Sequence, residues 1–542
     1  MKIALAQLNY IIGDFEGNKQ KILNAMVHAR QQDADLVVFA ELAISGYPPR
    51  DFLEFDDFVQ KCNDTVYEIA GNTGDMGVLV GLPTINHMDK GKNLRNSAAF
   101  LHQGKVKAFY HKTLLPNYDV FDEYRYFEPN RDFDVLEFKG KKIAVTICED
   151  IWNIDEHYQY LTSPLDELSS HKPDFVVNIA ASPYNYNQPR IRKNVLRSNV
   201  RRYGYPIVYV NHVGAQTELL FDGNSQVMNN QGESMLELKY FEEDFGVVDI
   251  EDTGARQDYP LPGKMESMEK ALVTGVQNYF RKLGLKKAIL GLSGGIDSAV
   301  TAAIAVSALG AENVYAVLLP SQFSSDHSVS DAEQLAQNLN MPYDSIAIRT
   351  IFEQFKQSLT PHFKNLPFDI TEENIQARTR GVLLMALSNK FGHILLNTSN
   401  KSEAAVGYGT LYGDMNGGLS VLGDVYKSEV FELARYMNRE QEIIPENIIT
   451  KPPSAELRPD QKDSDSLPDY EQLDAVLFKY IEQRKGPREI IQQGFDRDLV
   501  ERTLRMVNTT EYKRHQTPPI LRVSPKAFGM GRRMPIVAKY LA

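Results

Sequence analysis

A glycine-rich hexapeptide in the second half of the sequence has the composition of a phosphate-binding loop: Ser-Gly-Gly-Ile-Asp-Ser, residues 293–298. It stands between an apolar strand pattern and a helix of small residues, where backbone N–H groups and the helix N-terminus favour a bound anion. The lysine of a Walker A loop is missing, which argues against transfer of a γ-phosphate and favours release of pyrophosphate. Asp297 is placed to hold Mg²⁺ against phosphate oxygens. A lone Gly-Gly pair would more often be an ordinary turn, but the full hexapeptide favours a phosphate site.

Three residues in the first half have side chains suited to covalent catalysis. Cys148 directly follows a buried-strand pattern, and Glu41 and Lys112 also stand at predicted strand ends. A thiolate can attack a carbonyl carbon, a carboxylate can move the proton, and a lysine can stabilise the oxyanion. Each residue also has an ordinary alternative: a small buried thiol, a paired structural carboxylate and a solvated lysine. Taken singly, none of the three proves a catalytic site.

Apolar runs typical of buried strands alternate with helical patterns along the chain, which predicts an α/β protein. The strand patterns cover residues 35–39, 78–82, 142–147, 175–179, 287–292 and 314–319, and the helical patterns of the second half cover about 266–282, 297–309 and 330–340. The second half is therefore predicted to be a Rossmann-like parallel sheet with crossover helices. A Gly- and Pro-rich break predicts domains at 1–252 and 266–542 with a linker at 253–265. A Pro- and Asp-rich stretch at 451–468 is predicted to be a mobile loop.

The composition limits the classes of protein to which the chain can belong. Its 542 residues, 43% of them hydrophobic and 24% charged, suit large soluble globular domains with cores of their own. A net charge of −12 argues against a nucleic-acid partner. No apolar run is long enough to span a membrane, no export signal is visible, and two cysteines give no disulfide framework. We therefore expect a cytoplasmic protein with no membrane partner.

The second half resembles the ATP-pyrophosphatase superfamily, and within it the NAD synthetases, through the hexapeptide and later blocks in the order of that family. These blocks begin at Leu319, Glu373, Leu396, Gly407, Leu422, Lys451 and Glu511. The resemblance implies that ATP is bound by Gly291, Leu292, Ser293, Gly294, Gly295, Ile296, Asp297, Ser298, Thr398 and Lys427. It implies that deamido-NAD, the dinucleotide of nicotinic acid, is bound by Asn374, Arg378, Glu403 and Lys513, and Mg²⁺ by Asp297 and Glu403.

Some of these assignments have ordinary alternatives. Lys427 and Lys513 are also compatible with solvated surface charges, and Glu403 with a favourable carboxylate in the first turn of a helix. Leu411 and Gly418 stand where the shorter, ammonia-only NAD synthetases carry polar substrate contacts, so those contacts must differ in this chain.

The first half resembles the nitrilase superfamily in the segments around Glu41, Lys112 and Cys148, which implies an αββα sandwich. By that resemblance the three residues form a catalytic triad that hydrolyses the side-chain amide of glutamine. Cys148 attacks the carbonyl carbon, Lys112 stabilises the oxyanion, and Glu41 transfers the protons and then activates water. The further residues implied to bind or support glutamine are Tyr118, Glu123, Ser182 and Gln188.

Two of the implied glutamine contacts are less specific than the triad. Glu123 is equally compatible with a surface charge. Gln188 stands where related sequences often carry a basic residue, so it can only hydrogen-bond the substrate carboxylate, and Arg190 or Arg192 is an alternative partner.

The two resemblances together imply a division of labour. The first half would release ammonia from glutamine, and the second would adenylylate deamido-NAD with ATP and Mg²⁺ for ammonia to displace, giving NAD, glutamate, AMP and pyrophosphate. Two alternatives remain: a synthetase that amidates another acid, and a nucleotide-sensing module fused to an amidase. We also expect a homo-oligomer, because symmetric assemblies are common among large enzymes.

Overall fold

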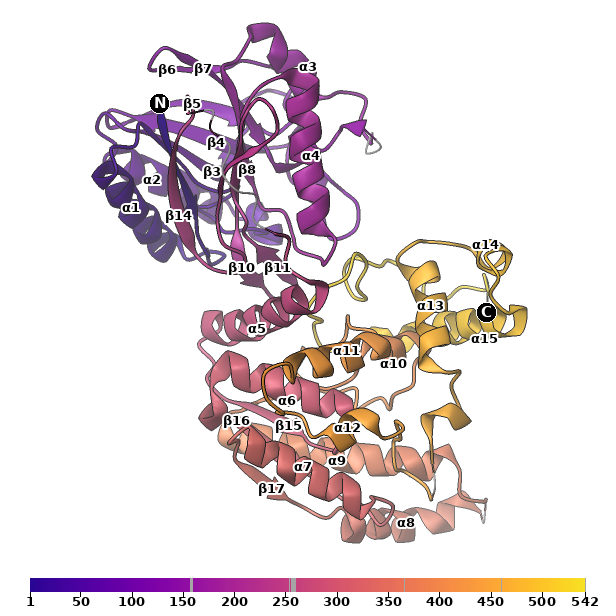
Figure 1. Cartoon of the computed structure of the whole chain (residues 1–542). Helices are drawn as coiled ribbons and strands as arrows, with labels where there is room; N and C mark the ends of the chain where they lie inside the picture. The colour runs from indigo at the N-terminus through magenta and orange to yellow at the C-terminus, as the bar shows by residue number, and fades with distance from the viewer. Residues whose placement is uncertain (156–158, 253, 255–259, 365, 460, 542) are drawn as a thin grey trace. The chain divides into compact units, whose positions relative to one another are not determined.

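The computed structural model describes residues 1–155, 159–252, 254, 260–364, 366–459 and 461–541, and the chain divides into two compact units, Met1–Pro262 and Gly263–Ala542 (Figure 1). Within the predicted linker at 253–265, residues 253 and 255–259 lie outside the described residues. Within those residues, none of the helices has both the length and the apolar character needed to cross a membrane.

The first unit contains two six-stranded sheets. The strand order of one is β14 (Asp244–Asp249), β1 (Lys2–Gln7), β2 (Leu36–Val38), β3 (Gly77–Ile85), β4 (Leu94–His102) and β5 (Lys105–His111). The order of the other is β13 (Ser234–Glu237), β12 (Gln226–Met228), β9 (Ile207–Asn211), β8 (Phe175–Ala180), β7 (Lys141–Ile147) and β6 (Leu136–Phe138). A hairpin of β10 (Val213–Gln216) and β11 (Leu219–Asp222) completes the strands of this unit's described residues.

Alternation of side chains along the strands builds two apolar layers. On β1, Ile3 and Leu5 pack against residues of the second sheet such as Val177, whereas Ala4 and Ala6 face the other way. That outer face is covered by α1 (Phe15–Gln31) and α2 (Asp56–Ala70), while α3 (Pro164–Leu168) and α4 (Gln188–Tyr203) cover the second sheet (Figure 1). The order of layers is helix, sheet, sheet, helix, which confirms the αββα prediction.

The second unit is built on a five-stranded parallel sheet. Its order is β17 (Tyr343–Ser345), β16 (Val314–Leu318), β15 (Ala288–Gly291), β18 (Ile394–Asn397) and β19 (Leu419–Ser420). The strand β15 lies between α6 (Ile296–Leu309) and α9 (Ile370–Phe391), which contact it from opposite faces (Figure 1). The chain runs outward from β15 to β17 and then returns to β18, so the direction of winding changes between β15 and β18. Ligands of open α/β sheets bind at such a point, beyond the carboxyl ends of the strands.

The other α-helices of the second unit pack around this sheet or against one another. They are α5 (Lys264–Lys282), α7 (Asp326–Asn338), α8 (Arg349–Phe363), α10 (Lys401–Val406), α11 (Lys427–Met437), α12 (Glu446–Thr450), α13 (Tyr470–Ile481), α14 (Pro487–Gln492), α15 (Arg497–Thr509) and α16 (Glu511–Arg514). The predicted parallel sheet with crossover helices is confirmed. Helix α7 begins at Asp326 rather than near residue 330, because Ser325 caps it by accepting a hydrogen bond from the Ser328 N–H.

Candidate functional site

A buried lysine held between two carboxylates forms the centre of the first unit. The ammonium of Lys112 donates hydrogen bonds to Glu41 Oε1 at 2.7 Å and to Glu123 Oε1 and Oε2 at 2.9 and 2.8 Å. Burial alone lowers the pKa of Lys112, but the charges of Glu123 and Glu41 outweigh it and raise that pKa well above the usual range. This direction favours the cationic form of the lysine, which is the form that stabilises an oxyanion.

Glu41 and Lys112 are brought together because each follows the end of a strand. Glu41 follows β2, and Lys112 is the first residue after β5. Glu123 comes from the short 3₁₀ helix Glu123–Arg125 and is buried, so its alternative as a surface charge is wrong. Burial raises the pKa of Glu123 to about 7, although Lys112 opposes that shift.

Three further groups fix the two carboxylates, and none of them is evident from the sequence. Asn96 donates to Glu41 Oε1 at 2.7 Å and to Glu123 Oε2 at 3.3 Å. The Tyr47 hydroxyl donates to Glu123 Oε1 at 3.0 Å, and the Ala181 N–H donates to Glu41 Oε2 at 3.0 Å. Asn96 lies inside a strand and Ala181 contributes only backbone, so no residue-type signal marks either one.

Cys148 stands on a sharp turn directly after β7. Its φ of 43° lies in the left-handed region, which is uncommon outside glycine and recurs at functional sites. Asp150 holds this turn by accepting hydrogen bonds from the N–H groups of Ile147, Thr113 and Leu114, so it ties the cysteine turn to the segment after Lys112. Burial and the Glu41 charge hold the pKa of the Cys148 thiol well above its usual range, with Lys112 opposing them. Cys148 therefore rests as a thiol, and a base must take its proton before the sulfur can act as a nucleophile.

The residues predicted to bind glutamine gather in two groups on the same unit. Tyr118 donates from its hydroxyl to Glu149 Oε1 at 2.8 Å, and Tyr160 donates to the same oxygen at 3.1 Å. Gln188 donates to Ser182 Oγ at 3.4 Å. Glu149 directly follows the cysteine and is buried, a position that the sequence interpretation did not single out.

One alternative partner of the glutamine carboxylate is contradicted. The guanidinium of Arg192 is fully buried and pairs with Asp222 through two hydrogen bonds. Because this guanidinium already makes a bidentate pair with Asp222, its paired N–H donors are not available to a substrate carboxylate. Arg190 is exposed on α4.

In the second unit, the hexapeptide leaves β15 and opens α6. Gly294 has a φ of 76°, and a Cβ on it would lie 2.1 Å from the Ser328 carbonyl oxygen, so only glycine fits. The Ser298 hydroxyl donates to the Gly295 carbonyl at 3.0 Å and shares a 3.1 Å hydrogen bond with the Ser293 hydroxyl. The loop is thereby closed on itself at a helix N-terminus, the geometry of an anion cradle.

A second lysine between two carboxylates lies at this helix start. Lys427 pairs with Asp297, and its ammonium lies 3.5 Å from Glu403 Oε1. Asn400 donates to Asp297 Oδ1 at 2.9 Å. Burial and the Asp297 charge raise the pKa of Glu403 to about 8, with Lys427 opposing. Lys427 is buried, so its alternative as a solvated surface charge is wrong.

Asp463 adds a third carboxylate to this region. It is buried and accepts hydrogen bonds from Tyr470 at 2.9 Å and from Tyr408 at 3.2 Å, and its charge helps raise the pKa of Lys427. Three carboxylates around one ammonium leave an excess of negative charge, which suits a hard divalent cation bridged to phosphate. The donor types therefore fit Mg²⁺, although no cluster of three metal-binding side chains occurs among the described residues.

Asp463 lies in the stretch 451–468 that the sequence predicts to be mobile. Two contacts tie the start of this stretch to the neighbourhood of the phosphate loop. Lys451 donates to Asp331 Oδ2 at 2.9 Å, and Glu456 Oε1 accepts a 2.8 Å hydrogen bond from the Ser328 hydroxyl. Ser328 is the residue whose carbonyl lies against Gly294.

Three of the four residues predicted to bind deamido-NAD converge on one loop, residues 407–414. Lys513 donates to the carbonyls of Gly407 and Gly409 at 2.7 and 2.8 Å. Asn374 accepts a 2.7 Å hydrogen bond from Thr410, and Arg378, which is exposed, donates to the Leu411 carbonyl at 3.1 Å. Thr398 is half-buried just beyond β18. Glu403 belongs to the Lys427 cluster instead.

Comparison with known protein families divides the chain at nearly the same place as the two structural units. The family described as carbon-nitrogen hydrolase matches residues 2–258, and the family described as NAD synthase matches residues 268–517. The two matches together span nearly the whole sequence.

Individual relatives match over their full length. A glutamine-dependent NAD(+) synthetase of Synechocystis sp. is 46% identical over 99% of this chain and 99% of its own. One of Thermotoga maritima is 42% identical over 100% of this chain and 99% of its own. The solved structure of the glutamine-dependent NAD+ synthetase of Acinetobacter baumannii in complex with ADP is 42% identical, with a TM-score of 0.79, and covers 99% of this chain and 98% of its own.

Proposed function

Because this chain belongs to the glutamine-dependent NAD(+) synthetase family, we propose that its first unit releases ammonia from glutamine and its second uses that ammonia to amidate deamido-NAD. Membership of an enzyme family excludes the alternative of a nucleotide-sensing module. The observation that carries the proposal is the presence of Cys148 beside a buried carboxylate–lysine–carboxylate cluster in one unit, with a phosphate cradle in the other.

In the proposed glutaminase reaction, Glu41 takes the proton of the Cys148 thiol and the thiolate attacks the amide carbon of glutamine. Lys112 donates to the oxyanion of the tetrahedral intermediate. Glu41 then protonates the leaving nitrogen, ammonia departs, and a γ-glutamyl thioester remains. The carboxylate next takes a proton from water, whose oxygen attacks the thioester and releases glutamate and the thiol.

Glu123 and Asn96 have a supporting role in this proposal. Both contact the Lys112–Glu41 pair, so they hold the lysine and Glu41 in position without touching the reacting carbon. Tyr118, Ser182 and Gln188 are proposed to bind the glutamine backbone and amide.

In the proposed synthetase reaction, the carboxylate oxygen of deamido-NAD attacks the α-phosphorus of ATP and expels pyrophosphate. Ammonia then displaces AMP from the acyl adenylate and leaves an amide. Residues 291–298, Thr398 and Lys427 bind the nucleotide in this proposal, and Asn374, Arg378 and Lys513 bind deamido-NAD. Asp297 and Glu403 would hold Mg²⁺, which supplies charge neutralisation for the departing pyrophosphate.

Three further properties are proposed: the cellular location, the route of ammonia and the oligomeric state. We propose a cytoplasmic enzyme in which ammonia travels by a protected route, because protonation in water would remove its nucleophilicity. Exposed apolar side chains on two neighbouring helices, α8 and α9, support a homo-oligomer. They are Ile351, Phe355, Ile370, Val382, Met385 and Phe391.

The test is a product assay on the purified chain with ATP, Mg²⁺ and deamido-NAD, supplied with either glutamine or an ammonium salt. Cys148→Ala is expected to lower glutamine-driven NAD formation on the order of 10³-fold or more and to leave ammonium-driven formation unchanged. The other cysteine, Cys62, is buried in a different cluster, so Cys62→Ala is the matched control and should retain both activities. No AMP and pyrophosphate from the unaltered chain, or loss of both nitrogen sources in Cys148→Ala, would contradict the proposal.

A further inference from the structure

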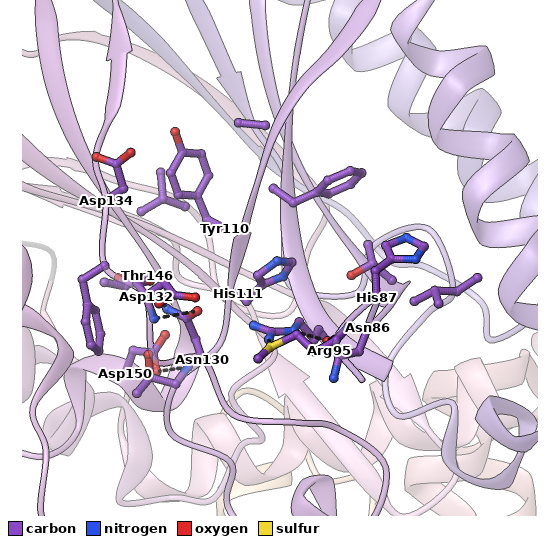
Figure 2. Close-up of a pocket in the computed structure, with 18 of the residues that line it drawn as sticks. Asn86, His87, Arg95, Tyr110, His111, Asn130, Asp132, Asp134, Thr146 and Asp150 are labelled. Carbon is purple, nitrogen blue, oxygen red and sulfur yellow. Dashed lines mark hydrogen bonds between the residues drawn. The ribbon is translucent and has the colours of Figure 1, made fainter. Parts of the chain in front are cut away.

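A cavity of about 780 Å³ in the first unit lies along edge strand β5, and none of Glu41, Lys112, Glu123 and Cys148 is among its lining residues. Its walls come from α2, from the ends of β3 and β4, from both faces of β5 and from residues 130–134, and also from β7, α3, Thr113 and Asp150. Figure 2 shows His111 in the middle of this cavity, with Arg95 and Asn86 on one side and Asn130 and Asp132 on the other.

Strand alternation separates this cavity from the catalytic cluster. On β4, Asn96 contacts Glu41, whereas its neighbours Arg95 and Ser97 point to the opposite face. The cavity is therefore a second hollow behind the catalytic strand ends.

Arg95 brings a buried positive charge to the cavity wall without a counter-ion. It is only 7% exposed, and its guanidinium donates to Asn86 Oδ1 at 3.1 Å and lies 2.9 Å from the Met88 sulfur. In the part of the chain that the structure describes, no carboxylate lies within ion-pair distance of it. A buried guanidinium normally pairs with an anion, because an amide oxygen and a thioether recover little of its lost hydration.

His111 places a second polar group beside Arg95. Its Nδ1 shares a 2.7 Å hydrogen bond with the Ser97 hydroxyl, which shares one of 2.6 Å with Thr84. This chain of hydroxyls fixes the ring, so that its other nitrogen is held in place at the cavity. Burial and the Arg95 charge lower the pKa of His111 to about 4, so the ring is neutral near pH 7 and is able to donate one hydrogen bond.

We propose that this cavity binds a small molecule through one oxyanion group, a carboxylate or a phosphate, which pairs with Arg95 and accepts a hydrogen bond from His111. The other side of the cavity carries Asp132 and Asp134, which are exposed. Their charges disfavour a ligand that is anionic at both ends. The ligand class is thus a molecule with one anionic group and a neutral or cationic remainder.

The test titrates the full-length protein separately with inorganic phosphate and with acetate, at constant ionic strength and with excess ATP to occupy the phosphate loop. The midpoint of thermal unfolding is expected to rise saturably with at least one anion, and the anion that acts identifies the oxyanion class. Arg95→Gln should weaken that apparent affinity at least about tenfold, and Arg95→Lys should weaken it less. Lys105→Gln, which removes an exposed charge from the neighbouring strand β5, is the matched control and should respond as the unaltered chain does.

Stability without an added anion separates binding from a structural role. Removing an unpaired buried charge should leave the unfolding midpoint of Arg95→Gln equal to or above that of the unaltered chain. A lower midpoint, together with an unchanged response to both anions, would overturn the proposal. If Arg95→Gln does not fold, His111→Gln replaces it, and an unchanged anion affinity in that variant also overturns the proposal.

Discussion

Both units place one buried lysine between two carboxylates, but the two clusters differ in how completely they are closed. Lys112 lies 2.7 Å from Glu41 and 2.8 Å from Glu123, whose side chains are 0% and 6% exposed. Lys427 pairs closely with Asp297 only, stands 3.5 Å from Glu403, and both of these carboxylates are 17% exposed. The first cluster is satisfied by the protein itself, whereas the second keeps carboxylate oxygens available.

The two clusters therefore differ in whether their charges are already arranged before a ligand binds. A closed cluster is preorganised before the substrate enters, so its lysine needs no rearrangement when an oxyanion forms. An open cluster with excess negative charge is completed by its ligand, and its properties depend on that ligand and on pH. The predictions below test whether each cluster behaves as its geometry indicates.

The largest expected effect is on the closed cluster. Glu41→Gln keeps the size of the side chain but removes the base, so glutamine-driven NAD formation should fall by about 10²–10⁴-fold. Ammonium-driven formation should be unchanged, because the second unit does not use this residue. Steady-state rates with each nitrogen source provide the measurement, with Glu137→Gln on the exposed face of β6 as the control. Equal losses with both nitrogen sources would show that the clusters do not act separately.

The next effect concerns the open cluster. Asp297→Asn should slow NAD formation from glutamine and from ammonium alike by about 10²–10³-fold, since it removes a carboxylate proposed to hold the Mg²⁺ that would neutralise the departing pyrophosphate. Asp326, an exposed acidic residue in the first turn of α7, provides the control Asp326→Asn. Retention of ammonium-driven synthesis in Asp297→Asn would contradict the assignment.

The smallest predicted effect uses pH. The pKa of Glu403 is raised to about 8, so this carboxylate is protonated below that pH and ionised above it. Mg²⁺ binds the ionised form, so the Mg²⁺ concentration for half-maximal rate should fall by up to about tenfold from pH 7 to pH 8 and then level off. Glu403→Gln should abolish this dependence, while Glu432→Gln, exposed on α11, should keep it. The same slope in Glu403→Gln would assign the titration to another group.

Much of the fold follows from local patterns. Continuous apolar runs such as 142–147 identify buried strands, and small residues after the glycine loop identify α6, because period and composition are local properties. Helix starts are less well determined. The start of α7 depends on the Ser325 cap, which the periodicity of residues 330–340 does not reveal.

The sites are predictable only in part, because their supporting groups come from distant segments. Cys148, Glu41 and Lys112 are marked by their residue type at strand ends. Asn96 looks like any polar strand residue until β4 is paired between β3 and β5. Asp463 is one of several acidic residues in a Pro-rich stretch, and its burial depends on two tyrosines elsewhere in the chain.

The environment of Cys148 also determines how the protein responds to oxidants. A thiolate, rather than a thiol, attacks peroxide and alkylating reagents, and the pKa of this cysteine is held well above its usual range by burial and by Glu41. The sulfur that we propose as the nucleophile is therefore unreactive between turnovers. A nucleophile that is activated only when its base takes the proton is protected from the sulfenic acid chemistry that inactivates cysteines of low pKa.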